Sequence, residues 1–377
     1  MSIPNSTDGA NTRPTLVLKG QAAEMTVDLG GGSIADFHLG EDGINPLAWD
    51  SRMFAPDPNA VSAMKPRPFG HFLCLDRWGS ASDAEKANGM TDHGEAGSVW
   101  WEVIKDPVSQ KGVIETSMAA SLPTAGIRVE RRIQLLDAEA VFLATESITN
   151  DNAIGRIYNI VQHPSIAGIF LDEKTVVDCN GTTGFTQHET LPNPQERVVQ
   201  WPNALNDQDQ SVDIRFLGED TEPEVVSYVV EDEYGWVTAV SPSTGLLFGY
   251  LWKSDEFPWI NLWRNAKDGR PFARGLEFGT SGLHRPGHDL VATGKIFDKA
   301  IYRYIDAQET QTFRYVSFLV NIPGGYAGVA SVNYDGKTIT IEEAGGKGRT
   351  FSLMASDLFQ KAEPAKQTPL DSRKEII

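Results

Sequence analysis

Short runs of β-branched and aromatic residues, each closed by Gly, Pro, Asn or Asp, recur along the whole chain. Such runs are typical of β-strands, and periodic helical stretches longer than about ten residues are hard to find. One short helix is predicted after Ser82, because Ser82 and Glu85 match the capping box of a helix N-terminus. The clearest predicted strands are Val99–Ile104, Ile127–Leu136, Val141–Thr149, Arg156–His163, Val225–Glu231, Leu246–Trp252, Trp259–Arg264 and Thr312–Val320. The pattern predicts an all-β protein.

The C-terminal part of the chain contains the strongest hairpin signal. Strands Ala330–Tyr334 and Lys337–Ile341 flank Asp335-Gly336, a dipeptide that favours a two-residue type I′ turn because glycine tolerates positive φ. The preceding run Tyr315–Tyr334 has 20 residues without a charge, which is long enough to span a membrane. Pro and Gly in its middle favour strand, turn and strand instead.

The domain organisation follows from the spacing of these runs. No shift in composition divides the chain, so we expect one domain over residues 15–355, with loosely ordered polar tails at 1–14 and 356–377. Many strands about 8–15 residues apart, with few helices, favour a large antiparallel double-sheet β-sandwich over a parallel α/β fold.

Charge and cysteine content exclude several classes of partner. The chain has 33 Lys and Arg against 51 Asp and Glu, a net charge of −18, which repels nucleic acid and anionic membranes. Cys74 and Cys179 stand alone, with no spacing typical of a disulfide framework or a zinc site. The N-terminal residues lack the pattern of a secretory signal, so we expect a cytoplasmic protein.

Polar residues set among apolar ones mark four candidate segments. Arg77 follows an apolar stretch that also holds His71 and Asp76, and His93 lies in a loop before a tryptophan-rich strand. His163 is predicted at a strand end, because the next residue is proline. Glu277 lies inside an apolar strand, where an unpaired carboxylate is costly to bury.

Each of these residues has an ordinary structural interpretation when it is taken alone. A single histidine at a strand end is more often a hydrogen-bonding cap than a catalyst. Arg77 could pair with a nearby acid, and Glu277 could face water at a sheet edge.

The strand at Trp259 offers a different kind of surface. Alternation along the strand places Trp259, Asn261 and Trp263 on one face. Aromatic planes beside hydrogen-bonding groups suit sugar rings, which have apolar faces and hydroxylated edges. Arg264 and Arg274 add positive charge nearby, which would suit a phosphorylated or acidic sugar.

From Glu24 to about Glu343 the chain resembles the aldose 1-epimerase (galactose mutarotase-like) superfamily. The resemblance rests on the order of an Arg-bearing strand with Arg77, a His-Gly loop with His93, a second histidine at His163 and a late Leu-Glu pair ending in Glu277. It implies the galactose mutarotase-like supersandwich fold and a protein that interconverts sugar anomers without a cofactor or a metal ion.

The resemblance also implies roles for these residues. Glu277 would be the base that takes the proton of the anomeric hydroxyl, and His163 the acid that protonates the ring oxygen, the two facing each other across one sugar. Arg77 and His93 would hold hydroxyls and the ring oxygen. The remaining substrate-binding candidates are Trp259, Asn261, Trp263 and Arg264.

Two departures leave alternatives open. The aspartate that galactose mutarotases place between the second histidine and the glutamate has no evident match, and Asp255 and Asn261 are only regional candidates for it. His163 is followed by Pro-Ser-Ile instead of an aromatic-Asn run. A non-catalytic protein that binds a sugar or oligosaccharide, or a polysaccharide lyase or hydrolase, is compatible with the same fold. The identity of the sugar and the oligomeric state stay open.

Overall fold

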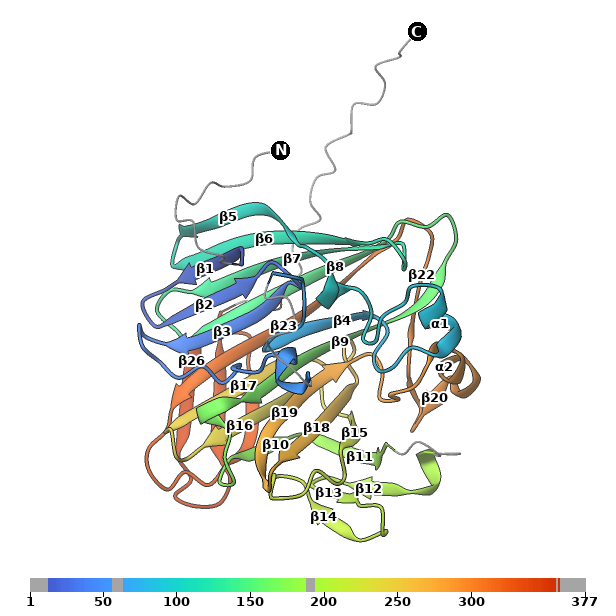
Figure 1. Ribbon diagram of the computed structural model, residues 1–377. Coiled ribbons are helices and arrows are strands. Elements are labelled where there is room, and N and C mark those ends of the chain that lie inside the picture. The colour runs from blue at the N-terminus through green and yellow to red at the C-terminus, as the bar shows by residue number, and fades with distance from the viewer. Residues whose placement is uncertain (1–12, 56–63, 188–193, 357–358, 360–377) are drawn as a thin grey trace.

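The structure, a computed structural model, describes residues 13–55, 64–187, 194–356 and 359. It is mostly β, with two large sheets packed face to face and short helices at one end (Figure 1). Every pairing between named strands in the described residues is antiparallel. The predicted all-β, antiparallel double-sheet sandwich is therefore confirmed.

The first sheet carries the features discussed below. In spatial order its strands, within the described part of the chain, are β1 (Thr15–Lys19), β2 (Ala23–Asp28), β3 (Ser33–Leu39), β4 (His71–Asp76), β9 (Arg156–Ala167), β19 (Arg270–Gly279), β18 (Trp259–Lys267), β15 (Val225–Val230), β11 (Gly181–Thr186) and β12 (Val198–Gln200), with β22 (Arg303–Ile305) beside β9.

The second sheet closes the other side of the core. Its order is β10 (Val176–Cys179), β16 (Tyr234–Ser241), β17 (Leu246–Lys253), β23 (Thr310–Asn321), β8 (Val141–Asn150), β7 (Ile127–Leu136), β6 (Val113–Leu122) and β5 (Glu102–Gln110).

Smaller elements cover the outside of the sandwich. A three-stranded sheet of β24 (Val329–Tyr334), β25 (Thr338–Glu343) and β26 (Thr350–Met354) packs on the second sheet through its own apolar cluster. The helices α1 (Asp83–Ala87) and α2 (Gly287–Thr293) lie side by side at one end of the first sheet (Figure 1). The other short elements are β13 (Asn203–Leu205), β14 (Ser211–Asp213), β20 (Lys295–Ile296), β21 (Lys299–Ala300), and the 3-10 turns η1 (Ser51–Phe54), η2 (Ala96–Ser98), η3 (Gly168–Phe170) and η4 (Pro194–Glu196).

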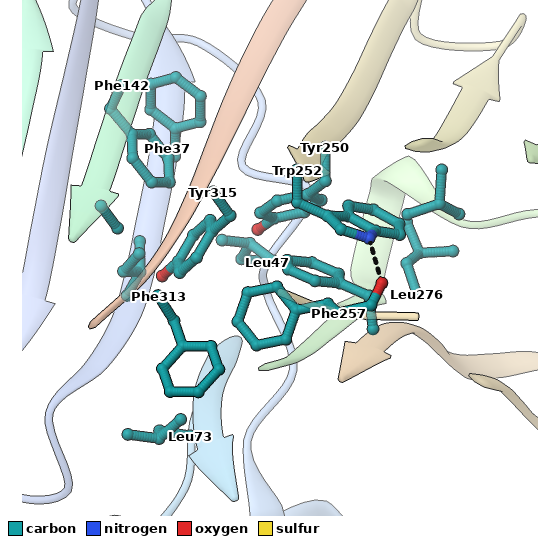
Figure 2. Packing of buried hydrophobic residues seen from close by; sticks show 14 of the residues in the cluster. Phe37, Leu47, Leu73, Phe142, Tyr250, Trp252, Phe257, Leu276, Phe313 and Tyr315 are labelled. Carbon is teal, nitrogen blue, oxygen red and sulfur yellow. Dashed lines mark hydrogen bonds between the residues drawn. The ribbon is translucent and has the colours of Figure 1, made fainter. Parts of the chain in front are cut away.

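The main core lies between the two large sheets. Side chains from both sheets meet there, and Figure 2 shows the aromatic rings of Phe37, Phe142, Tyr250, Trp252 and Tyr315 among them. Phe37 of β3 meets Phe142 of β8 edge to face at 5.0 Å, and Trp252 of β17 stacks on Phe278 of β19 at 4.1 Å. The buried indole Nε1 of Trp252 donates to the carbonyl of Phe257 at 2.8 Å, so its polar group is satisfied.

Most local predictions agree with the structure. Ser82 caps α1: its Oγ accepts the N–H of Glu85, and the Glu85 carboxylate accepts the N–H of Ser82. The hairpin of β24 and β25 forms, with Gly336 at φ 92°, although the connection holds three residues and not two. The apolar run from Tyr315 is strand, loop and strand, and no helix among the described residues is long and apolar enough to cross a membrane.

Two strand limits were wrongly predicted. The strand expected at Val99 starts at Glu102, because the residues before it approach the β2–β3 turn, where the N–H of Trp101 donates to Leu29. His163 is not at a strand end: β9 continues to Ala167 through Pro164. The proline is tolerated because β9 and β19 form no pair at Pro164. Its missing N–H therefore removes no hydrogen bond from that ladder.

An ion pair is buried in the core beneath β9. The guanidinium of Arg131 lies 2.7 Å from the carboxylate of Glu146, and both side chains are almost fully buried. Glu146 also accepts a hydrogen bond of 2.6 Å from Gln162, whose Oε1 meets His71 at 3.0 Å. The polar groups under the central strands are therefore linked to one another, as burial at this depth requires.

We expect Arg131→Met to lower the free energy of unfolding by about 3–5 kcal/mol, because it leaves the Glu146 carboxylate buried without its cation. The double variant Arg131→Met/Glu146→Gln should be clearly more stable than the single one, because the amide keeps an acceptor for Gln162 without a charge. Urea unfolding followed by tryptophan fluorescence measures both. A double variant no more stable than Arg131→Met would contradict this account of the pair.

Candidate functional site

A cavity of about 730 Å³ opens on the outer face of the first sheet, over β4, β9, β19 and β18. The loops after β4, after β3 and before α2 form its walls. The residues that line it are Trp49, Ser51, Phe54, Pro68, Phe72, Trp78, Ser80, His93, His163, Gln187, Glu224, Val225, Trp263, Glu277, His284, Arg285 and Pro286. A volume of this size is within the usual range for small-molecule sites.

The register of four strands places the central residues in one row. Phe72 of β4 is opposite His163 of β9, and Glu277 of β19 is opposite Asn261 of β18. The pairs Gly275–Ser165 and Phe278–Gln162 on either side bring Glu277 level with His163. Since successive side chains on a strand point to opposite faces, this row points away from the core to which Leu276 and Phe278 belong.

The hollow exists because the next row has small residues on β9 and β19. Ser165 and Gly275 are paired there, with Trp263 beside Gly275. A Cβ on Gly275 would lie 2.8 Å from Oε1 of Glu277 and 3.0 Å from Cβ of Trp263. Glycine at this position therefore leaves the space that the carboxyl group of Glu277 occupies.

His163 and Glu277 are in direct contact. Nε2 of the imidazole is 3.2 Å from Oε1 of the carboxyl group, and Nδ1 is 3.0 Å from the hydroxyl of Ser165. The other carboxyl oxygen of Glu277, Oε2, accepts a hydrogen bond of 2.6 Å from Nε1 of Trp78. The sequence-based expectation that the two groups face each other across a sugar is wrong: they lie side by side on the floor of the cavity.

Burial controls the protonation of this pair. It raises the pKa of the Glu277 carboxyl well above its ordinary value, and the Trp78 hydrogen bond opposes that shift only in part. Burial, together with the neighbouring His93, lowers the pKa of His163 well below its ordinary value. Both shifts favour the uncharged form of each group, so burial favours a pair that shares one proton and has no net charge.

A strained turn at the end of β4 brings Trp78 to Glu277. Asp76, the last residue of β4, has φ 81°, and its buried carboxylate pairs with Arg156. Arg77 follows and forms a salt bridge of 2.8 Å with Glu85 of α1. The two ion pairs on either side hold the turn that delivers the indole of Trp78 to the carboxyl group.

His93 reaches the same cavity from a left-handed backbone position, with φ 61°. Its Nδ1 accepts the N–H of Gly79 at 3.3 Å, so the proton of the neutral ring is on Nε2. Burial lowers the pKa of His93 to about 4, which keeps the ring neutral. His93 therefore offers a neutral N–H donor at a ring distance of 5.6 Å from His163.

Aromatic rings surround the imidazole of His163. Phe72 stacks on it at 4.2 Å, and Trp263 lies edge-on at 6.1 Å. Trp49 is nearly parallel to it at 6.5 Å and meets Trp263 edge to face. An apolar wall next to a hydrogen-bonding pair is the arrangement that binds the faces and edges of a sugar ring.

Several residues of the cavity were not singled out from the sequence. Trp49, Trp78, Glu224 and His284 line it from loops, where the strand pattern gives no signal. Glu224 falls in chain order between His163 and Glu277, the interval in which the motifs located no acid. Order along the chain is the one signal that could have pointed to it.

Four of the expected substrate contacts are absent from the cavity. Trp259 points to the predicted face but is buried under the segment before α2, with Nε1 bonded to the carbonyl of Ala300. Asn261 is buried and donates to the carbonyl of Ser281. Trp263 alone of that strand lines the cavity.

The two arginines among these four are engaged elsewhere. Alternation puts Arg264 on the face opposite Trp263, where it donates to the carbonyls of Thr221 and Pro223. Arg274, suggested for an acidic sugar, likewise donates to the backbone of Arg215 and Ile214. Arg77 is bound to Glu85 and does not line the cavity either. No group of three or more His, Cys, Asp or Glu in the described ranges could hold a metal ion.

Comparisons with known proteins identify the fold of this chain. No family model matches the chain, and no curated protein matches it. Among solved structures, a galactose mutarotase related enzyme from Lactobacillus acidophilus superposes with a TM-score of 0.58 at 11% identity, over 82% of this chain and 99% of that one.

Two further structures agree. A galactose mutarotase-like protein from Lactobacillus casei has a TM-score of 0.57 at 11% identity, over 81% of this chain and all (100%) of that one. A galactose mutarotase-like protein from Clostridium acetobutylicum has the same TM-score of 0.57 and identity of 11%, over 81% and 95% of the two chains. The chain therefore has the fold of the galactose mutarotase-like proteins.

Proposed function

We propose that this protein is an aldose 1-epimerase-like isomerase, which opens and recloses a sugar ring and so interconverts its two anomers. The observation that supports this most is the contact of 3.2 Å between His163 and Glu277 on the floor of an aromatic cavity. The fold shared with galactose mutarotase-like proteins is consistent with it.

The adjacency of the pair suits the reaction better than opposite positions would. The anomeric hydroxyl and the ring oxygen are both bonded to C1, so the groups that act on them must lie close together. The Glu277 carboxylate takes the proton of the anomeric hydroxyl while His163 gives a proton to the ring oxygen. The bond from C1 to the ring oxygen breaks and the C1 carbonyl forms. Rotation about C1–C2 and the reverse transfers give the other anomer.

The proton needed for both steps is already in the pair. With the proton on Glu277, both groups are neutral, as burial favours. One transfer across the hydrogen bond converts this form into carboxylate and imidazolium, the base and acid of the reaction. The Trp78 donor stabilises the carboxylate in that form. No charge enters or leaves the cavity during turnover.

Neighbouring groups would position the sugar. The Nε2–H of His93 can donate to a hydroxyl or to the carbonyl of the open form, and Glu224 can accept from hydroxyls at the other end. Trp49, Phe72 and Trp263 would cover the apolar face of the ring.

A second candidate is binding without catalysis. It is favoured by the contacts of both nitrogens of His163, Nδ1 with Ser165 and Nε2 with Glu277, because each nitrogen already has a hydrogen-bonding partner. The two candidates differ in one measurement: a binding protein retains sugars without accelerating their anomer exchange.

We expect Glu277→Gln and His163→Ala each to lower kcat for anomer exchange by about 10²–10⁴-fold, because each removes one proton-transfer group. Saturation-transfer NMR on a panel of aldoses measures the exchange rate directly. Val108→Ala, on an exposed position of the second sheet, is the matched control and should keep the parent rate. Parent protein that accelerates no aldose, or variants as active as the parent, would refute the proposed function.

The pH profile of kcat/KM tests the role of Trp78. Activity requires the one-proton pair, so it falls at low pH when His163 gains a proton and at high pH when Glu277 loses its proton. Trp78→Phe removes the donor that lowers the pKa of Glu277, so the high-pH limb should move to higher pH while the low-pH limb stays. We also expect kcat to fall by about 10- to 100-fold. A high-pH limb that stays or moves down would rule out this role.

The role of Gly275, which leaves space for the Glu277 carboxyl group, can be tested separately. Gly275→Ala should reduce kcat by up to about 10²-fold, because its Cβ would displace the carboxyl group from His163. Gly324→Ala, where a Cβ meets nothing within 4 Å, is the control. Circular dichroism and thermal unfolding check that both variants are folded, and full activity of folded Gly275→Ala would show that the carboxyl position is not critical.

A further inference from the structure

Two strands of the cavity floor carry a second pair of polar residues on their inner faces. His71 of β4 and Gln162 of β9 directly precede Phe72 and His163, so their side chains point away from the cavity and into the core. Both are buried, and Nε2 of His71 lies 3.0 Å from Oε1 of Gln162. A hydrogen bond in the core thus joins the same two strands that the stacking of Phe72 on His163 joins on the cavity side.

This inner contact belongs to a hydrogen-bonded chain that crosses the core. Nδ1 of His71 lies 3.0 Å from the hydroxyl of Tyr250 on β17, whose ring Figure 2 shows in the core. At the other end, Nε2 of Gln162 donates to Glu146 of β8 at 2.6 Å, and Nε of Arg131 on β7 donates to the same carboxylate at 2.7 Å. Since β17, β8 and β7 belong to the second sheet, β4 and β9 are tied to that sheet through the core.

The hydrogen bonds of this chain allow one arrangement. The amide of Gln162 gives its N–H to a carboxylate, so its Oε1 accepts from Nε2 of His71. Nδ1 of the same ring then accepts the hydroxyl proton of Tyr250. Burial, together with the charge of Arg131, lowers the pKa of His71 to about 3, which keeps the ring neutral. A satisfied polar network of this kind fixes the positions of its members more closely than apolar packing does.

The backbone ladder is interrupted where the side chains of His163 and Glu277 meet. β9 and β19 are paired at Ser165 and again at Gln162, but these two described strands form no pair at the rows of Pro164 and His163 between them. The register is the same on both sides of this gap, which places Glu277 opposite His163 within it. Ladder hydrogen bonds therefore do not set the separation of the two strands at these rows.

At the gap, β9 is held from its other sides. β4 pairs with it at Phe72–His163. From the core, the amide of Gln162 holds it through His71 and Glu146. The chain ends in a buried ion pair, and apolar residues of the same volume are often as stable as such a pair. The position that the chain gives to β9 therefore explains it better than stability does.

We propose that His71 and Gln162 are positioning residues, which fix β9 from the core side so that His163 stays in hydrogen-bonding distance of Glu277 although the ladder is open between them. This inference rests on the proposed function for the chemistry of the pair. Neither positioning residue lines the cavity, so both act through His163.

His71→Leu tests the proposal, because it removes both hydrogen bonds of the ring. We expect kcat for anomer exchange to fall by about 10- to 100-fold, with KM within about threefold of the parent, since the pair loses its alignment while the cavity walls stay. His71→Gln, whose amide can donate to Gln162, should be about three- to tenfold more active than His71→Leu. Saturation-transfer NMR measures these rates. Parent kcat in folded His71→Leu would overturn the positioning role and leave the proposed function intact.

Leu18→Ala is the matched control for lost stability. Leu18 is fully buried in the same core, on the edge strand β1, which β2 and β3 separate from β4. Its truncation removes core packing and leaves the hydrogen-bonded chain intact, so kcat should equal that of the parent. A loss of kcat in folded Leu18→Ala as large as in His71→Leu would trace the effect to stability and overturn the inference.

Imidazole ¹⁵N NMR separates the inference from the proposed function, because it needs no turnover. In histidine-labelled protein, assigned against His163→Ala, the Nε2 resonance of His163 reports its hydrogen bond to Glu277. We expect this resonance to shift in His71→Leu and to stay in Leu18→Ala. If no sugar is exchanged, the proposed function fails, and this pattern still supports the positioning role. An unchanged resonance in folded His71→Leu would overturn that role even if kcat falls.

Tyr250→Phe takes the place of His71→Leu if that variant does not fold. It keeps the ring in the core and removes only the hydroxyl that fixes Nδ1 of His71. The His163 resonance should again shift, and kcat should fall by about three- to tenfold, the effect of one hydrogen bond. A His163 resonance and a kcat that both match the parent would contradict the proposal.

Discussion

The structure around the cavity depends on one constraint: a carboxyl group, Glu277, is 1% exposed on the outer face of a β-sheet. A group so buried needs hydrogen-bond partners for both oxygens, and His163 and Trp78 provide them. Glycine at 275 leaves the room for it. The strained turn at Asp76 serves the same carboxyl group, because it brings the indole N–H of Trp78 to Oε2 of Glu277. The residues of the site are thus arranged so that the buried Glu277 carboxyl group has space and hydrogen-bond partners.

The strands that carry the pair are buried on both faces. Their inner face belongs to the sandwich core, and their outer face is covered by η1, by the loop after β4 and by the segment before α2. Polar groups lie on both sides of β9, with Gln162, Glu146 and Arg131 linked beneath it and His163 above it. The sheet and the core beneath it hold the pair in place, while loops shape the side that faces the cavity.

How much the sequence predicted depended on the range of the interactions. Strand limits such as Ile127–Leu136, the hairpin near Gly336 and the capped helix at Ser82 follow from local periodicity and turn chemistry, and they agree with the structure. The alternation of side chains along a strand correctly predicted the face of the sheet on which Trp263 lies. The same alternation should have placed Arg264 on the opposite face, where its guanidinium binds backbone carbonyls.

The sequence by itself determined the all-β sandwich, because strand and turn preferences act over a few residues, and it supplied His93, His163 and Glu277 as candidates through their order. Only the tertiary structure decided that His163 and Glu277 touch, that Trp78 and Glu224 join them, and that Trp259 and Asn261 are covered. These facts depend on the register of β4, β9, β19 and β18 and on loops far apart in the chain. Register arises from the packing of whole sheets, and no local pattern encodes it.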